Sequence, residues 1–156
     1  MILFQDFKKF IQLLNKHKVK YLLVGGYAVS LYSRPKSTQD IDIFIEKSIK
    51  NANKILKVLD EFGLASLGIT VNDLTTKDRV VQLGVSPLRI DLMTSIEGVD
   101  FSSAFKKRTK IKYWDIKDVS FISYEDLITN KKTVGRKKDI EDLEWLRKYI
   151  NEKIDD

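Results

Sequence analysis

The sequence contains no cysteine among its 156 residues, and His17 is its one histidine. The lack of cysteine excludes disulfides, thiolate metal sites and cysteine nucleophiles together. His17 ends the first predicted helix, where a surface residue is more common than a catalyst. No apolar run approaches the roughly 18 residues that a membrane span needs. The opening residues MILFQDFKKF carry charge too early for the apolar core of a signal peptide. We therefore expect a cytoplasmic protein without a membrane segment.

The charges that are present favour the basic side. The chain carries 28 Lys and Arg against 22 Asp and Glu, so its formal net charge is +6. A basic surplus favours a polyanionic partner such as nucleic acid or a triphosphate, although a lysine-rich proteome would produce the same balance. With 43% hydrophobic and 32% charged residues, the composition is that of an ordinary globular protein. The length fits one domain, which we assign to residues 1–156.

Hydrophobic periodicity predicts helices and strands along most of the chain. Helices are predicted over 3–17, 27–33, 123–132 and 139–154, and one more between Ser48 as its N-cap and Gly63 as its C-terminal stop. Ser123 and Asp126 form a capping-box-like start to the helix over 123–132. Strands are predicted over 21–24, 41–46, 80–85, 89–93, 109–113 and 118–122, with a turn at Ser86-Pro87. The last helix is expected to bury Ile140, Leu143, Leu146, Ile150 and Ile154. This order of elements favours an α/β (α+β) fold in which helices pack on one mixed β-sheet.

Three carboxylates lie on predicted strands. Asp40 and Asp42 are two residues apart, so they point to the same face of their strand. Adjacent carboxylates repel unless a cation lies between them, and such oxygen ligands suit Mg²⁺ shared with substrate phosphates. Asp91 lies inside the apolar strand LRIDLM, where a charge is costly unless it is paired or metal-bound. If the two strands are neighbours, all three carboxylates converge. Alternatively, Asp40 is a cap, Asp42 is an exposed face residue and Asp91 pairs with Arg89.

A glycine pair, Gly25-Gly26, separates the first predicted strand from the next helix. Such a turn lets backbone N–H groups face an anion, and the following helix N-terminus adds a favourable dipole. Taken alone, a Gly-Gly pair usually marks only a turn.

The segment VGGYAVSLYSRPKSTQDIDIFIE, residues 24–46, resembles the signature of the polymerase-β-type nucleotidyltransferase superfamily. That signature is Gly followed by Gly or Ser, a spacer, and then Asp, an apolar residue, and Asp or Glu. The spacer here covers residues 27–39. Asp91 matches the third carboxylate of the superfamily. The C-terminal VGRKKDIEDLEWL resembles the Gly-Arg-x-Lys-Asp element of small bacterial members, which are related to minimal nucleotidyltransferases and abortive-infection nucleotidyltransferase-like toxins.

This resemblance implies roles for the acids and the glycines. Asp40 and Asp42 would bind metal and bridge it to the triphosphate. Asp91 would bind a second metal and help to deprotonate the acceptor hydroxyl. Gly25 and Gly26 would hold the β- and γ-phosphates. Two Mg²⁺ ions suit in-line phosphoryl chemistry because they stabilise both the attacking and the leaving oxygens.

Basic residues are expected to neutralise the rest of the triphosphate. Arg34, Ser37 and Thr38 lie just before Asp40 in the sequence. In KKTVGRKKD, residues 131–139, five of nine residues are Lys or Arg, and we select Lys132, Arg136 and Lys138 as nucleotide-binding candidates. This segment joins the last two predicted helices, so we expect it to lie at the rim of the Asp40/Asp42 site. The alternative is a solvated turn between helices.

Two classes of function remain open at this point. The first is a Mg²⁺-dependent enzyme that transfers a nucleoside monophosphate from an NTP to a hydroxyl of RNA, protein or a small molecule and releases pyrophosphate. The second is a non-catalytic binding module of the same fold, such as the antitoxin of a toxin–antitoxin pair or a regulatory partner. Three costly carboxylates favour the enzyme, because a retired site need not keep them. A basic RNA-binding protein without catalysis is a weaker third possibility.

Overall fold

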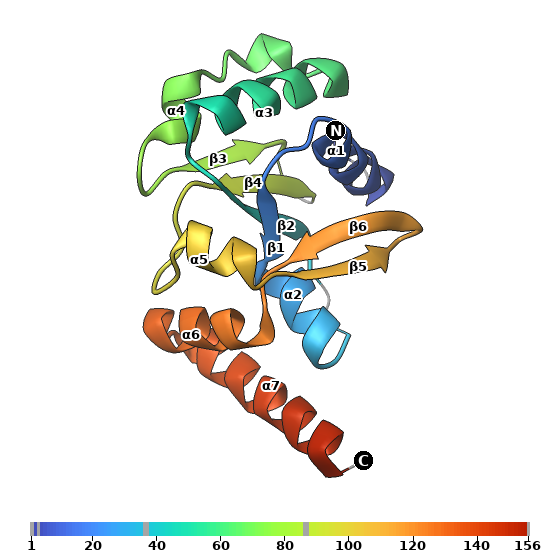
Figure 1. The fold of residues 1–156 in the computed structure, drawn as a ribbon, viewed down its shortest axis with the longest axis vertical. Helices are drawn as coiled ribbons and strands as arrows, with labels where there is room; N and C mark the ends of the chain where they lie inside the picture. Colours follow the sequence, from blue (N-terminus) through green and yellow to red (C-terminus); the bar gives the residue numbers. More distant parts are fainter. Residues whose placement is uncertain (1, 3, 36–37, 86–87, 156) are drawn as a thin grey trace.

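One mixed sheet runs through the middle of the molecule, with helices packed against it (Figure 1). The computed structural model describes residues 2, 4–35, 38–85 and 88–155. Within them the strands are β1 (Tyr21–Val24), β2 (Asp40–Ile45), β3 (Val80–Leu83), β4 (Arg89–Met93), β5 (Thr109–Tyr113) and β6 (Ile116–Phe121). The helices are α1 (Phe4–Lys16), α2 (Gly25–Tyr32), α3 (Ile49–Phe62), α4 (Val71–Thr75), α5 (Phe101–Lys106), α6 (Tyr124–Val134) and α7 (Lys137–Asp155), with a 3₁₀ turn at Ala65–Leu67.

The strand order is β3-β4-β2-β1-β6-β5. Strand β2 runs parallel to β4 and antiparallel to β1, and β1 runs parallel to β6. The outer pairs, β3 with β4 and β5 with β6, are antiparallel. Strand β2 is therefore central, which explains why Ile41, Ile43 and Ile45 are all buried. The predicted mixed sheet with packed helices is confirmed.

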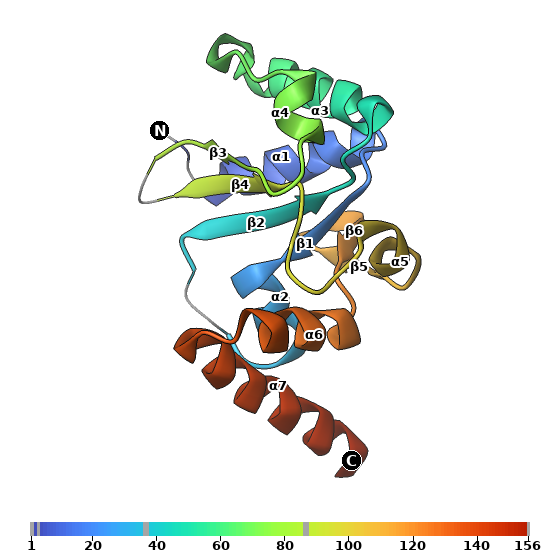
Figure 2. The ribbon, with the colours of Figure 1, turned by 90° about the vertical axis from the view of Figure 1, so that its left-hand side faces the viewer.

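The helices cover the sheet from two ends of the molecule. In both views α1, α3 and α4 lie toward one end, and α6 and α7 lie toward the other (Figures 1 and 2). Helix α1 buries Phe7, Phe10, Ile11 and Leu14, the spacing that its sequence pattern predicts. Helix α2 packs on β1 and β2 and also contacts α6 and α7. It thus connects the sheet to the C-terminal helices. No helix in the described ranges combines the length and apolarity needed to cross a bilayer.

Several predicted helix ends are confirmed by their capping groups. The Ser48 side chain accepts a hydrogen bond from the Asn51 backbone N–H, and Gly63 ends α3 in a left-handed conformation with φ 92°. The Ser123 side chain accepts from the Asp126 backbone N–H and so begins α6. Local sequence signals were sufficient here because a cap is formed within one turn of the chain.

Other boundaries differ from the prediction. Helix α2 begins at Gly25 rather than residue 27, β6 begins at Ile116 rather than 118, α7 begins at Lys137 rather than 139, and helices α4 and α5 were not predicted. The predicted Ser86-Pro87 turn and the side chain of Ile154 lie outside the described residues.

The predicted buried face of α7 is wrong at two positions. Ile140 is 53% exposed and Ile150 is 36% exposed, whereas Leu143 and Leu146 are buried as expected. The buried face also includes Asp139 and Asp142. Residues 139, 142, 143 and 146 follow the i, i+3, i+4, i+7 spacing of one helical face. An apolar-only pattern therefore misplaced the face, because acidic side chains occupy part of it.

Candidate functional site

The parallel pairing of β2 and β4 brings the three predicted carboxylates together. Asp42 is the direct register partner of Asp91, and Asp40 is the partner of Arg89. Asp40 and Asp42 point to the same face because they are two residues apart on one strand. Asp91 is only 4% exposed. Asp40, Asp42 and Asp91 thus form one acidic group on the neighbouring strands β2 and β4, as the sequence predicted for adjacent strands.

Arg89 makes ion pairs with two of these acids. Its Nε donates to Asp91 Oδ1 at 2.7 Å and its Nη2 donates to Asp91 Oδ2 at 3.0 Å, so the guanidinium is bidentate. The same Nη2 donates to Asp40 Oδ2 at 3.1 Å. The pairing of Asp91 with Arg89 that the sequence allowed is therefore present.

Asp42 is the one carboxylate of the three that does not pair with Arg89. Among the described residues no hydrogen bond or ion pair reaches its side chain. Burial, together with repulsion by Asp91 and Asp40, raises the pKa of Asp42 to about 6, although Lys138 and Lys131 act in the opposite direction. An ionised Asp42 is thus destabilised by its surroundings, and a cation beside it would relieve that cost.

The chemistry of these donors suits a hard divalent cation, although the side chains are not arranged around one. Within the described part of the chain, no three His, Asp or Glu side chains form a group that could hold a metal ion as they lie. Arg89 already holds both oxygens of Asp91 and one of Asp40. Carboxylate oxygens are nevertheless the ligands that Mg²⁺ prefers, and Asp42 presents one carboxylate that lacks a cation.

Glycine is required at position 25, next to Asp42. Gly25 has φ 64°, and a side-chain carbon there would overlap the Asp42 carboxylate. At Gly26 the added carbon would lie 3.1 Å from the side chain of Thr38. Helix α2 begins at these glycines, and no side chain caps its N-terminus. Its first backbone N–H groups are therefore available to an anion beside Asp42.

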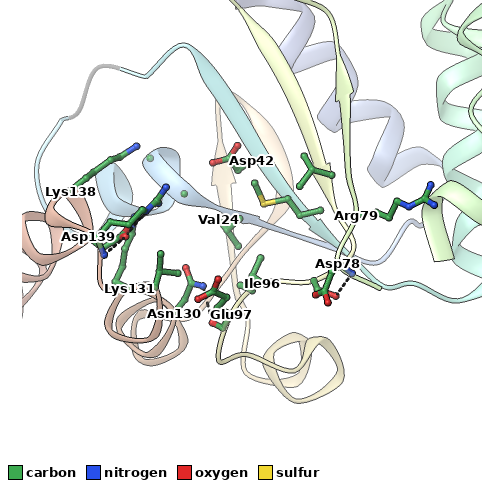
Figure 3. Close-up of a pocket in the computed structure, with 17 residues that line it drawn as sticks. Val24, Asp42, Asp78, Arg79, Ile96, Glu97, Asn130, Lys131, Lys138 and Asp139 are labelled. Atoms are coloured by element: carbon green, nitrogen blue, oxygen red, sulfur yellow. Dashed lines mark hydrogen bonds and ion pairs between the residues drawn. The ribbon is translucent and has the colours of Figure 1, made fainter. Parts of the chain in front are cut away.

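A cavity of about 560 Å³ opens in front of this turn (Figure 3). Gly25, Gly26 and Asp42 form one wall. Lysines from the C-terminal helices lie on one side, and Asp78 and Arg79 lie on the other (Figure 3). Of the three carboxylates only Asp42 lines this cavity within the described residues.

The basic wall of the cavity is held by a buried ion-pair network. Lys131 is 5% exposed, and its Nζ lies 3.1 Å from Asp139 Oδ1 and 3.0 Å from Asp142 Oδ2. Arg136 Nε donates to Asp139 Oδ2 at 2.8 Å. These contacts fix the junction of α6 and α7 and hold Lys131 in the wall of the cavity. Lys131 was not among the residues selected from the sequence, although it lies four residues after the buried Leu127 and thus on the same helical face.

A protein-family model described as "Nucleotidyl transferase of unknown function" matches residues 3–155. The chain belongs to this nucleotidyl transferase family. No curated protein matches the sequence.

Solved structures place this family member in the nucleotidyltransferase fold. TM1012 of Thermotoga maritima, assigned as a nucleotidyltransferase, is 19% identical with a TM-score of 0.57, over 95% of this chain and 92% of that one. The lincosamide antibiotic adenylyltransferase LnuA, solved with lincomycin, is 18% identical with a TM-score of 0.57, over 94% and 97%. ANT(2")-Ia, solved with adenylyl-2"-tobramycin, is 13% identical with a TM-score of 0.58, over 96% and 90%.

Not every predicted nucleotide-binding residue of this nucleotidyl transferase lies at the cavity. Arg136 and Lys138 line it, as do Gly25 and Gly26. Thr38 lies behind Gly26 and donates a hydrogen bond to the Asp40 carbonyl at 3.0 Å. Two residues lie elsewhere: Arg34 stacks on Trp145 at 3.7 Å and pairs with Glu141, and Lys132 is exposed outside the cavity. The predicted residue Ser37 lies outside the described residues.

Proposed function

We propose that this chain transfers a nucleoside monophosphate from an NTP to a hydroxyl group, with Mg²⁺ as the cofactor. The hydroxyl oxygen of the acceptor forms a bond to the α-phosphorus, and the bond between that phosphorus and the bridging oxygen of the β-phosphate breaks. Pyrophosphate leaves, and the acceptor loses its proton. The observation that carries the proposal is one cavity that joins Asp42, the Gly25-Gly26 turn and the lysines of the C-terminal helices.

The glycine turn and the basic wall supply the triphosphate site in this proposal. The uncapped N-terminus of α2 offers backbone N–H groups, and glycine lets the phosphates approach the backbone closely. Lys138 supplies positive charge from the opposite side. Lys131 and Arg136 lie beside it, but their charges are shared with Asp139 and Asp142. A triphosphate brings about four negative charges, so fixed cations around it lower the cost of binding.

The carboxylates supply the metal site in this proposal. When bound, Mg²⁺ neutralises the phosphate oxygens and stabilises the charge that develops on the leaving pyrophosphate. Asp42 would be the first ligand, because it is the carboxylate that both lines the cavity and lacks a cation. Its register partner Asp91 would be the second, and Asp40 the third. The protein otherwise contributes position and charge, which are the main sources of catalysis in phosphoryl chemistry.

The first test is pyrophosphate release. Purified protein is incubated with each of the four NTPs, MgCl₂ and separate pools of RNA, protein and small-molecule acceptors. We expect release with at least one NTP and one acceptor pool, and none with Asp42→Asn. Lys57→Ala is the control, because this exposed lysine lies on α3 at the other end of the molecule (Figure 1). Equal release by wild type and Asp42→Asn would reject the proposed site.

A further inference from the structure

Arg89 holds two members of the acidic group through one rigid fork. Its guanidinium takes both oxygens of Asp91, at 2.7 and 3.0 Å, and one oxygen of Asp40, at 3.1 Å. The Arg89 side chain is 27% exposed and that of Asp91 only 6%. Planar, bidentate contacts of this kind are stronger than those of an ordinary surface pair. The Arg89 guanidinium is thus positioned to bind the carboxylates of Asp91 and Asp40 at the same time.

The charge balance shows what this arrangement leaves open. Asp40, Asp42 and Asp91 carry three negative charges when ionised, and Arg89 supplies one positive charge. The remaining two negative charges equal the charge of one divalent cation. A cation that binds Asp42 alone meets no competitor among the described residues. A cation that also binds Asp91 must take an oxygen that Arg89 now holds.

We propose that Arg89 is a positioning residue that keeps Asp40 and Asp91 in place in the metal-free protein and competes with an incoming divalent cation for their oxygens. This inference rests on the proposed function, because it assumes that the acidic group is a metal site. Binding of the cation shifts Arg89 off at least one carboxylate oxygen. The arginine thereby lowers metal affinity in the absence of nucleotide while it keeps the buried Asp91 compensated.

A purely structural arginine would behave in the opposite way. If Arg89 only supported its neighbours, its removal would disorder the ligands and weaken metal binding. If it competes with the metal, its removal frees oxygens and tightens metal binding. The sign of the change in metal affinity therefore separates the two roles, whatever happens to stability.

The test measures Mn²⁺ and Mg²⁺ binding to the full chain without nucleotide, by calorimetry and by melting temperature. We expect Arg89→Gln to bind either ion about tenfold or more tightly than wild type, because a charge-assisted hydrogen bond exceeds the free energy of one factor of ten. Its metal-free melting temperature should fall, and saturating metal should restore it. Arg89→Lys should lie between the two, since one ammonium group cannot form the same fork. If Arg89→Gln fails to fold, the metal affinity of Arg89→Lys still tests the inference.

Arg79→Gln is the matched control. Arg79 also lines the cavity, but its ion pair is with Asp73 at 3.1 Å, outside the acidic group. Its removal should leave metal affinity unchanged. Unchanged or weaker affinity in both Arg89 variants would overturn the inference, and the proposed function would stand if wild type still releases pyrophosphate. Absence of metal binding in every protein, including Arg89→Gln, would overturn the inference together with the metal site.

Discussion

Asp42→Asn should stabilise the metal-free protein at neutral pH and change it little near pH 4. Burial and repulsion by Asp91 and Asp40 raise the pKa of Asp42 from 3.8 to about 6, so the folded chain holds this proton more tightly than the unfolded chain does. Between these two values the folded state binds more protons, and the free energy of unfolding falls as pH rises. Above pH 6 the folded state bears the full free-energy cost of an ionised Asp42. Asparagine carries no charge and avoids it.

The size of the effect follows from the shift. About 2 pKa units at 1.36 kcal/mol each correspond to roughly 3 kcal/mol. We therefore expect Asp42→Asn to gain about 2–3 kcal/mol over wild type at pH 7.5, with most of that gain absent at pH 4. A gain of this size is a large fraction of the stability of an ordinary domain. It would show that the acidic group is maintained at a cost to folding.

Urea denaturation at both pH values, in the presence of a chelator, measures this difference. Asp73→Asn is a control of opposite sign. Hydrogen bonds from Thr70 hold the pKa of Asp73 below its ordinary value, so its carboxylate stabilises the fold at neutral pH and loses that effect as pH falls. Asp73→Asn should therefore be destabilised at pH 7.5. If Asp42→Asn were no more stable than wild type at pH 7.5, the ionised Asp42 carboxylate would not destabilise the fold.

Three further substitutions test the walls of the cavity. Gly25→Ala should lose about 1–3 kcal/mol and more than Gly63→Ala, because both glycines have positive φ but only the first would also push its new methyl into a neighbouring carboxylate; urea denaturation compares them. Lys131→Met should cost about 3–5 kcal/mol in the same assay, since it removes the buried ammonium group that pairs with the carboxylates of Asp139 and Asp142. Lys138→Ala should weaken NTP binding in calorimetry by about tenfold, whereas Lys132→Ala, outside the cavity, should not. Equal losses of affinity would mean that both lysines bind the nucleotide, as the sequence predicted.

Sequence was sufficient where the determining contacts are local. Helix α1 follows from the spacing of its apolar residues, and the caps at Ser48 and Ser123 are each made within one turn. The three acids could be selected because a charge within an apolar strand needs a partner or a metal. That β2 and β4 are neighbours was only a conditional prediction. Their pairing joins Asp40 to Arg89 across 49 residues, and no local pattern encodes it.

The failures at the C-terminal helices have the same origin. Lys131 and Lys132 are neighbouring residues of the same type, yet only Lys131 points inward and pairs with Asp139 and Asp142. Arg34 was selected for its closeness in sequence to the acids, but it stacks on Trp145 of α7 instead. Which basic side chain reaches the cavity depends on how α6 and α7 pack, and that is settled by tertiary contacts.

The most direct test of the central claim compares NTPs labelled at different phosphates. The substrate that releases pyrophosphate is prepared with the label at the α-phosphate and, separately, at the γ-phosphate, and each is incubated with wild type, Mg²⁺ and the acceptor. Transfer of a nucleoside monophosphate predicts that the α-label appears on the acceptor and that the γ-label leaves in pyrophosphate. Both the labelling of the acceptor and the release of labelled pyrophosphate should be lost in Asp42→Asn. Appearance of the γ-label on the acceptor, or no labelled acceptor with any of the four NTPs, would contradict the account.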